Sequence, residues 1–256
     1  MNRIHLFEFE DQKWFPSFLR NYGTDFLQFL SNKSKMFKLV IPILEKALVK
    51  SNTNQIIDLG AGGLLWINSE LKKKIPNLKI TLTDYYPNIS AFKFTKVQSD
   101  NFEYIKESID ARNVPLELKG FRTQFLSFHH FKQSEAKLIL QNAIASNVPI
   151  AIFEAQERSL KSILGMIFSP LTVLFVTPFI KPFEIGRIVF TYLIPIVPLF
   201  VLWDEIVSCL RTYSIKEIKE LIEDTENYDY YDWEINRVVS GPGVILYLLG
   251  TEMIEV

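Results

Sequence analysis

Short apolar runs alternate with amphipathic stretches along most of the chain. Apolar residues recur at helical spacing over residues 34–50, and a buried-type run beginning at Gln55 ends in an acid and a glycine cluster, "NQIIDLGAGG". The next stretch predicts a helix from Leu64 to Lys74, and "LKITLTD" (78–84) has the β-branched residues typical of a strand. A strand, a helix and a second strand within about thirty residues form a βαβ unit, which predicts a parallel sheet.

The same alternation continues to the C-terminus. The remaining predicted elements are a helix at 88–95, strands at 103–110 and 121–128, a helix at 134–146 with Ser134 as N-cap, a strand at 149–155, a helix at 214–225 opened by a capping box of Ser214 and Glu217, and a hairpin of strands at 230–239 and 243–250. Together they predict an α/β fold with a doubly wound, mostly parallel seven-stranded sheet, a C-terminal antiparallel hairpin and a hydrophobic helical insertion.

Composition and charge restrict the classes of function. The chain has 28 basic and 29 acidic residues, for a net charge of -1, which argues against a general nucleic-acid binder because such proteins concentrate Lys and Arg. The single cysteine, Cys209, belongs to no Cys/His cluster, so we expect no metal site and a reducing compartment. Three acids within the first eleven residues, without a continuous apolar core, are not typical of a signal peptide, so a cytoplasmic location is expected.

Candidate ligand-binding residues lie where the predicted strands end. Asp58, Gly60, Gly62 and Gly63 follow the first strand, and Asp84 ends the second, 24 residues after Gly60. Glycines there let a ligand approach the backbone closely, and an acid on the next strand end can bind both hydroxyls of a ribose. A dinucleotide fingerprint GxGxxG would need a third glycine where Leu65 stands, which weakens an NAD interpretation.

The spacing of Asp58, Gly60 and Gly62 resembles motif I of the class I, Rossmann-like S-adenosylmethionine-dependent methyltransferases. By this resemblance Asp84 would bind the ribose, and Asp110 and Ala111, after the third strand, would bind the adenine. A carboxylate at Asp58 also suits a cofactor that carries a sulfonium and an ammonium group. The resemblance covers residues 36–156 and 205–250, and it implies S-adenosylmethionine as cofactor. One departure is Leu64, which stands where the motif has a third glycine.

Two of the three histidines, His129 and His130, lie together after the predicted fourth strand. A histidine is a suitable base for an oxygen or nitrogen acceptor near neutral pH, and because successive residues point to opposite sides, we expect one of them, His130, to face the cofactor. The alternative is that both are structural. Glu154, at the end of the fifth strand, is a third catalytic candidate, with capping of a neighbouring turn as the alternative.

A long apolar insertion, residues 158–204, separates the fifth strand from the last helix. Residues 163–180 and 188–203 carry no charge, but prolines divide both runs: Pro170, Pro178, Pro182, Pro195 and Pro198. A spanning helix needs about 20 apolar residues and disfavours interior prolines. Three interpretations stay open: a lid over a hydrophobic acceptor pocket, the same lid in peripheral contact with one membrane leaflet through residues 163–203, and a two-pass hairpin.

These observations lead to one main hypothesis of function. We expect methyl transfer from S-adenosylmethionine to a hydrophobic small-molecule or lipid-like acceptor, without nucleic acid as partner. The expected parts are an aromatic-rich N-terminal cap at 1–35, which by the resemblance would place Trp14, Phe15 and Arg20 near the acceptor, a cofactor-binding domain at 36–157 and 205–256, and the insertion. The alternative, which Leu64 allows, is a catalytically silent, membrane-associated protein of the same fold that binds the cofactor or a lipid.

Overall fold

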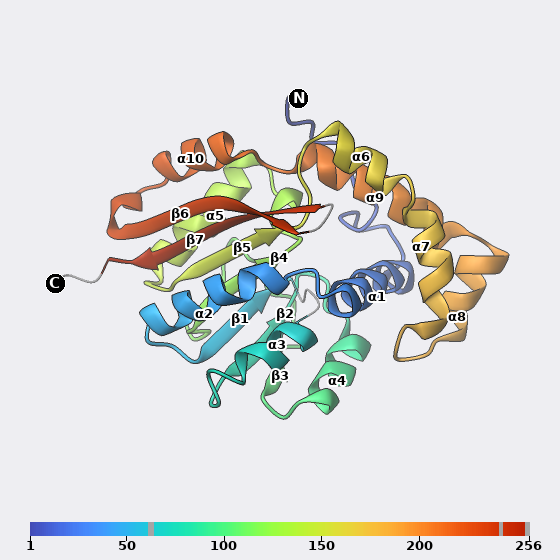
Figure 1. Ribbon diagram of the computed structural model, residues 1–256, viewed down its shortest axis with the longest axis horizontal. Coiled ribbons are helices and arrows are strands. Elements are labelled where there is room, and N and C mark those ends of the chain that lie inside the picture. Colours follow the sequence, from blue (N-terminus) through green and yellow to red (C-terminus); the bar gives the residue numbers. More distant parts are fainter. Residues whose placement is uncertain (61–63, 241–242, 254–256) are drawn as a thin grey trace.

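A seven-stranded mixed sheet forms the centre of the molecule (Figure 1). The computed structural model describes residues 1–60, 64–240 and 243–253. The strand order is β3-β2-β1-β4-β5-β7-β6, with the first five strands parallel and β7 antiparallel to both neighbours. The strands are β1 (Gln55–Leu59), β2 (Lys79–Thr83), β3 (Phe102–Tyr104), β4 (Phe121–Phe125), β5 (Ile150–Glu154), β6 (Tyr231–Ser240) and β7 (Gly243–Glu252). The predicted doubly wound sheet and its C-terminal hairpin are therefore confirmed.

Helices cover both faces of the sheet. Because successive strand residues face opposite sides, Ile56 packs with one group of helices and Ile57 with the other. One face holds α2 (Ile41–Lys50), α3 (Leu65–Leu71) and α4 (Ile89–Gln98), and the other holds α5 (Gln133–Ala145) and α10 (Ile215–Glu223). The order of the strands reverses between β1 and β4, and ligands of such sheets bind at the carboxyl ends of the strands on either side of that point.

Several predicted boundaries were wrong for local reasons. The strand expected at 103–110 ends at Tyr104, because its neighbour β2 ends at Thr83 and offers no longer ladder. Helix α5 begins one residue earlier than expected, and its N-cap is Lys132 rather than Ser134, since the Glu135 carboxylate accepts the Lys132 N–H at 3.1 Å. The capping box of Ser214 and Glu217 is confirmed at the start of α10.

The insertion and the N-terminus form a third packed unit at one end of the sheet (Figure 1). The insertion folds as short helices broken near its prolines: α6 (Leu160–Met166), α7 (Ser169–Val176), η3 (Thr177–Phe179), α8 (Ile185–Ile188), the π-helix η4 (Val189–Leu193) and α9 (Ile196–Arg211). They pack against α1 (Ser17–Ser34), with Phe26, Val173 and Phe200 buried between them. The short helices η1 (Lys38–Val40), η2 (Phe128–His130) and η5 (Tyr228–Tyr230) complete the order of elements.

Candidate active site

A cavity of about 590 Å³ lies at the carboxyl ends of β1, β2 and β4. Its lining includes five residues that the sequence singled out: Gly60, Asp84, Asp110, Ala111 and His130. Residues 50 or more positions apart in the chain thus meet in one place, as expected for loops that follow adjacent parallel strands. A cavity of this size is typical of a small-molecule or cofactor site.

Gly60 is at a position that only glycine fits well. Its φ is +150°, a conformation that side-chain-bearing residues rarely adopt, and a Cβ atom there would lie 2.9 Å from the Ser127 Oγ. The Gly60 N–H donates to the Thr83 carbonyl at 3.0 Å, which holds the end of β1 beside the end of β2. Gly62 and Gly63 lie outside the described residues.

We predict that Gly60→Ala lowers the free energy of unfolding by about 1–3 kcal/mol, because the new residue would hold a strained backbone and contact Ser127. Urea denaturation measures this change. Gly165→Ala is the matched control, since a Cβ on Gly165 in α6 would meet nothing within 4 Å. Equal stability of the two variants would contradict the role given to Gly60.

Asp84 lies directly after β2 and lines the cavity. Its Oδ1 accepts the Tyr86 N–H at 2.7 Å, which fixes the side chain in the turn that follows the strand. Burial raises the pKa of the Asp84 carboxyl above its ordinary value, although the Tyr86 N–H lowers it. A partly desolvated carboxylate of this kind can accept hydrogen bonds from a bound ligand, as the ribose assignment requires.

Asp110 reaches the same cavity from a turn instead of a strand end. The Ile109 N–H donates to the Asp84 carbonyl at 2.9 Å, so the two acid-bearing loops are neighbours. The Asp110 carboxylate is held by the Arg112 guanidinium, with Nη2 at 2.7 Å from Oδ2, and Arg112 also binds Glu135. Although burial opposes the charged form, these contacts with Arg112 keep the pKa of Asp110 below its ordinary value. An adenine amine would therefore share this carboxylate with Arg112.

Asp58 is fully buried and is not among the residues that line the cavity. Its Oδ1 accepts the Thr123 hydroxyl at 2.8 Å, and its carbonyl accepts the Thr83 hydroxyl at 2.8 Å. The side chain thus links β1 to β4 beneath the cavity. Leu64 is also directed away from the site: its side chain is 3% exposed and packs in the core with Ile67 and Leu71.

His129 and Glu154 form a buried pair behind the cavity. His129 Nδ1 lies 2.8 Å from Glu154 Oε2, and Glu154 Oε1 accepts the N–H groups of Phe128 and His129 at 2.8 and 3.1 Å. Glu154 therefore caps the short helix η2, the alternative that the sequence left open, and orients the His129 ring. His129 is not among the cavity-lining residues, although its ring centroid lies 4.3 Å from that of His130.

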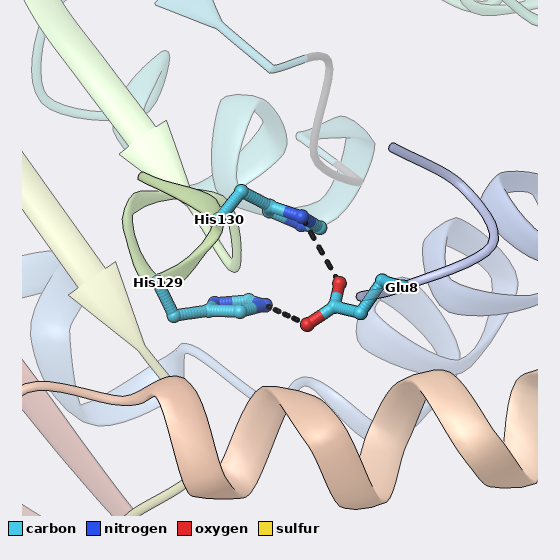
Figure 2. Close-up of side chains that lie close together, drawn as sticks. All are labelled: Glu8, His129 and His130. Carbon is cyan, nitrogen blue, oxygen red and sulfur yellow. Dashed lines mark ion pairs between the residues drawn. The ribbon is translucent and has the colours of Figure 1, made fainter. Parts of the chain in front are cut away.

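His130 lines the cavity from η2 and binds two carboxylates of the N-terminal segment, residues 1–16. Figure 2 shows one of them, Glu8. The His130 Nδ1 lies 2.8 Å from Asp11 Oδ1 and 3.0 Å from Glu8 Oε2. Burial lowers the pKa of His130, but the two carboxylates outweigh it and raise the pKa well above its ordinary value. The two carboxylates therefore stabilise the charged form of this ring.

The histidine and carboxylate cluster resembles a metal site in composition, but a guanidinium already supplies its positive charge. Glu8, His129 and His130 offer ligand atoms within 4.8 Å of one another. However, Arg211 Nη1 lies 3.1 Å from Glu8 Oε1, the same oxygen that lies 3.9 Å from His129 Nε2 (Figure 2). A divalent cation bound to that oxygen would be repelled by Arg211. We therefore describe the cluster as a buried network of ion pairs.

The N-terminal segment lines the cavity on the side away from the sheet, with His5, Phe7 and Glu10 among its contributions. Asp204 of α9 anchors it by accepting the N–H groups of Phe9 and Glu10 at 2.8 and 3.1 Å. Burial raises the pKa of Asp204 to about 7. The sequence predicts a cap at residues 1–35, and Arg20 lines the cavity as expected, but only the acidic run "EFED" hints at the contribution of Glu10 and Asp11.

The insertion does not form the expected lid over this cavity. None of the described residues between 158 and 204 lines it, whereas Arg20 of α1 does. Trp14 and Phe15 are likewise absent from the lining, and Phe15 packs in the third core cluster instead. The physical reason is that α1 and the N-terminal segment lie between the cavity and the insertion.

Comparison with known proteins identifies the fold. No protein-family description and no curated protein sequence matches the chain. Among solved structures, the plantazolicin methyltransferase BpumL, in complex with a pentazolic desmethylPZN analog and SAH, matches with a TM-score of 0.55 and 12% identity over 92% of this chain and 98% of that one. Human N-acetylserotonin methyltransferase in complex with SAM matches with a TM-score of 0.51 and 14% identity over 92% of this chain, which spans 58% of the human protein.

A third structure, titled a putative Zn-dependent alcohol dehydrogenase from Rhodobacter sphaeroides, matches with a TM-score of 0.50 and 12% identity over 93% of this chain and 98% of that one. At such identities the likeness concerns the fold alone. The strand order and the antiparallel hairpin, together with these matches, define a Rossmann-like fold that this chain shares with the two methyltransferase structures.

Proposed function

We propose that the protein transfers a methyl group from S-adenosylmethionine to a hydrophobic small-molecule or lipid-like acceptor. The observation that carries this proposal is the convergence of Gly60, Asp84 and Asp110 on one cavity at the carboxyl ends of β1 and β2. Solved structures of the same fold were determined with SAM or SAH. The three residues match the cofactor positions that the sequence resemblance implies.

The chemistry of the lining suits this cofactor. Asp84 is placed to accept hydrogen bonds from ribose hydroxyls, and Ile109 and Ala111 offer apolar surface for an adenine ring, with Asp110 at its edge. When bound, the cofactor supplies an electrophilic methyl group with a good leaving group, so the protein's main task is to align the acceptor and exclude water.

We assign the proton transfer to His130 rather than to His5, which also lines the cavity, because burial lowers the pKa of His5 to about 4 and makes it a weak base. A free imidazole at this position can take a proton from the acceptor, and Glu8 and Asp11 stabilise the imidazolium that forms. Glu154 and His129 are positioning residues: they hold η2, and therefore the His130 backbone, in place. The acceptor would lie against the apolar part of the lining, formed by Leu27, Phe37, Phe125 and Leu126.

This assignment predicts a pH dependence. Because His130 has a raised pKa, the fraction of free base and hence kcat/KM should increase as pH rises through that pKa, above 6.5. Asp11→Asn removes one of the two carboxylates, so the midpoint should move to lower pH. Glu157→Gln, which changes a carboxylate away from the cavity, is the control. Identical profiles for wild type and Asp11→Asn would contradict the assignment.

The class of acceptor can be tested directly. The purified protein is incubated with S-adenosylmethionine and either an organic-phase lipid extract or an aqueous metabolite extract, and S-adenosylhomocysteine formation is measured. We expect turnover above background with the lipid extract only, and its loss in His130→Asn. Turnover with the aqueous extract alone would show that the proposed acceptor class is wrong.

A further inference from the structure

The outward side of the insertion is an apolar surface. Its largest exposed side chains are Phe168, Phe175, Phe179, Phe183, Ile185 and Leu193, which we call the apolar face; Phe175 is 75% and Leu193 77% exposed. The chain from Leu160 to Phe179 is long and apolar enough to cross a membrane. Only 17% of an 18-residue stretch within it is buried inside the protein. Contiguous exposed apolar surface of this kind is typical of an interaction site.

The opposite side of the same helices is fixed to the rest of the molecule. Val173 and Ile180 are buried against α1 and α9 in the third core cluster. Arg187 is also buried, and its guanidinium forms an ion pair with Asp25 of α1. A spanning helix would have to withdraw these groups and leave Asp25 buried without its cation, which is strongly unfavourable. The segment is therefore suited to lie along a surface, with one face inward and the other outward.

Charge distinguishes the partners that such a surface could bind. The segment from Leu160 to Trp203 has three basic residues, Lys161, Lys181 and Arg187, and one acidic residue, Glu184. Its net charge is therefore positive, whereas the net charge of the whole chain is -1. Lys161 and Lys181 are both exposed beside the apolar face. In a symmetric dimer the two copies of this surface would together bring four lysines and only two Glu184 carboxylates to the interface, so positive charge would be in excess. A bilayer with anionic headgroups complements them.

We propose that the apolar face binds an anionic lipid bilayer as an interfacial surface, with its phenylalanines in the headgroup region and Lys161 and Lys181 on lipid phosphates. The insertion also contacts the wall of the cavity at Trp203, outside the apolar face. Trp203 Nε1 donates to the Phe7 carbonyl at 2.9 Å, their rings are 5.3 Å apart, and Phe7 lines the cavity. If the proposed function holds, bilayer binding would bring the enzyme to the phase that contains an apolar acceptor; bilayer binding itself does not depend on methyl transfer.

Vesicle flotation of the full chain tests the inference. The vesicles are phosphatidylcholine with phosphatidylglycerol at a 3:1 ratio, or phosphatidylcholine alone. We expect the wild type to float with the anionic vesicles, less with the neutral ones and less at high salt. Phe175→Asp combined with Phe179→Asp should weaken binding at least about 10-fold, since each substitution replaces an apolar side chain that would leave water by a charged one. Val97→Asp, at an 82% exposed position on α4, is the matched control.

Three results would overturn the proposal. The first is that the wild type does not float with anionic vesicles. The second is a dimer in sedimentation without lipid that the double variant dissociates, which would assign the apolar face to a second copy of the chain. The third is vesicle-bound protein that resists alkaline carbonate extraction, which would indicate a spanning segment. Because S-adenosylmethionine binding is measured separately in lipid-free solution, failure of the proposed function and failure of this inference are distinguishable.

Discussion

Asp84→Ala is expected to raise the Kd for S-adenosylmethionine at least about 100-fold. A carboxylate that accepts two ribose hydroxyls makes two charge-assisted hydrogen bonds, each worth about 1.5–3 kcal/mol, and each 1.4 kcal/mol is tenfold in Kd. Asp84 is placed for this role because it follows β2, lines the cavity and is oriented by the Tyr86 N–H. Isothermal titration calorimetry measures the change.

Asp100→Ala is the control for this variant, because Asp100 is a second carboxylate of the same region that binds Lys72 at the surface and does not line the cavity. Its Kd should equal that of the wild type. The melting temperature of Asp84→Ala should also be measured, so that a folding defect is recognised. A folded Asp84→Ala variant with unchanged affinity would show that the ribose assignment is wrong.

Arg211→Met is expected to lower the free energy of unfolding by about 3–5 kcal/mol, the usual effect of removing one partner from a buried ion pair. The Arg211 side chain is 2% exposed and binds Glu8 and Asp11, and its Nε donates to the Leu6 carbonyl at 2.7 Å. Without the Arg211 guanidinium, the buried Glu8 carboxylate loses one of the cations that stabilise its negative charge. Urea denaturation measures the loss.

Two further variants make this result specific. Arg237→Met, on the exposed part of β6, should change stability by less than about 0.5 kcal/mol, as for surface substitutions in general. The double variant Glu8→Gln with Arg211→Met should be destabilised by less than the sum of the two single variants, because it removes both charges of one pair. Strict additivity would contradict the ion-pair network described above.

The sheet could be predicted from the sequence because its signals are local. Apolar runs such as residues 55–59 and 150–154, when separated by amphipathic helices, are typical of a parallel sheet. The turn residues "SGPG", between two strand-like runs, predicted the antiparallel hairpin from an equally local signal. The boundary errors arose where a partner limits the length: Tyr104 at the end of β3 pairs with Leu82, one residue before the end of β2, so a strand to residue 110 would have had no partner.

The candidate site was only partly predictable. Asp84, Asp110 and His130 line the cavity as expected, although only Asp84 directly follows its strand; Asp110 lies six residues beyond β3 and His130 five beyond β4. Asp58 has the right spacing but is buried under the cavity, because spacing does not say which side of the strand faces the ligand. Glu8 and Arg211 could not be anticipated, since their ion pair joins residues 203 positions apart.

The insertion shows the same limit at a larger scale. Its prolines predicted broken helices, and these are present. Its place after β5 suggested a lid, yet the N-terminal segment and α1 line the cavity on that side. Composition does not show which side of an apolar helix faces the protein. In the structure, the buried ion pair of Asp25 and Arg187 marks the inward side.

The most direct test of the central claim is calorimetric titration of the wild-type chain, without lipid, with S-adenosylmethionine and separately with NAD. The account predicts saturable binding of S-adenosylmethionine at one site per chain, competed by S-adenosylhomocysteine, and weaker or no binding of NAD. Absence of saturable binding of S-adenosylmethionine, or tighter binding of NAD at the same site, would contradict it.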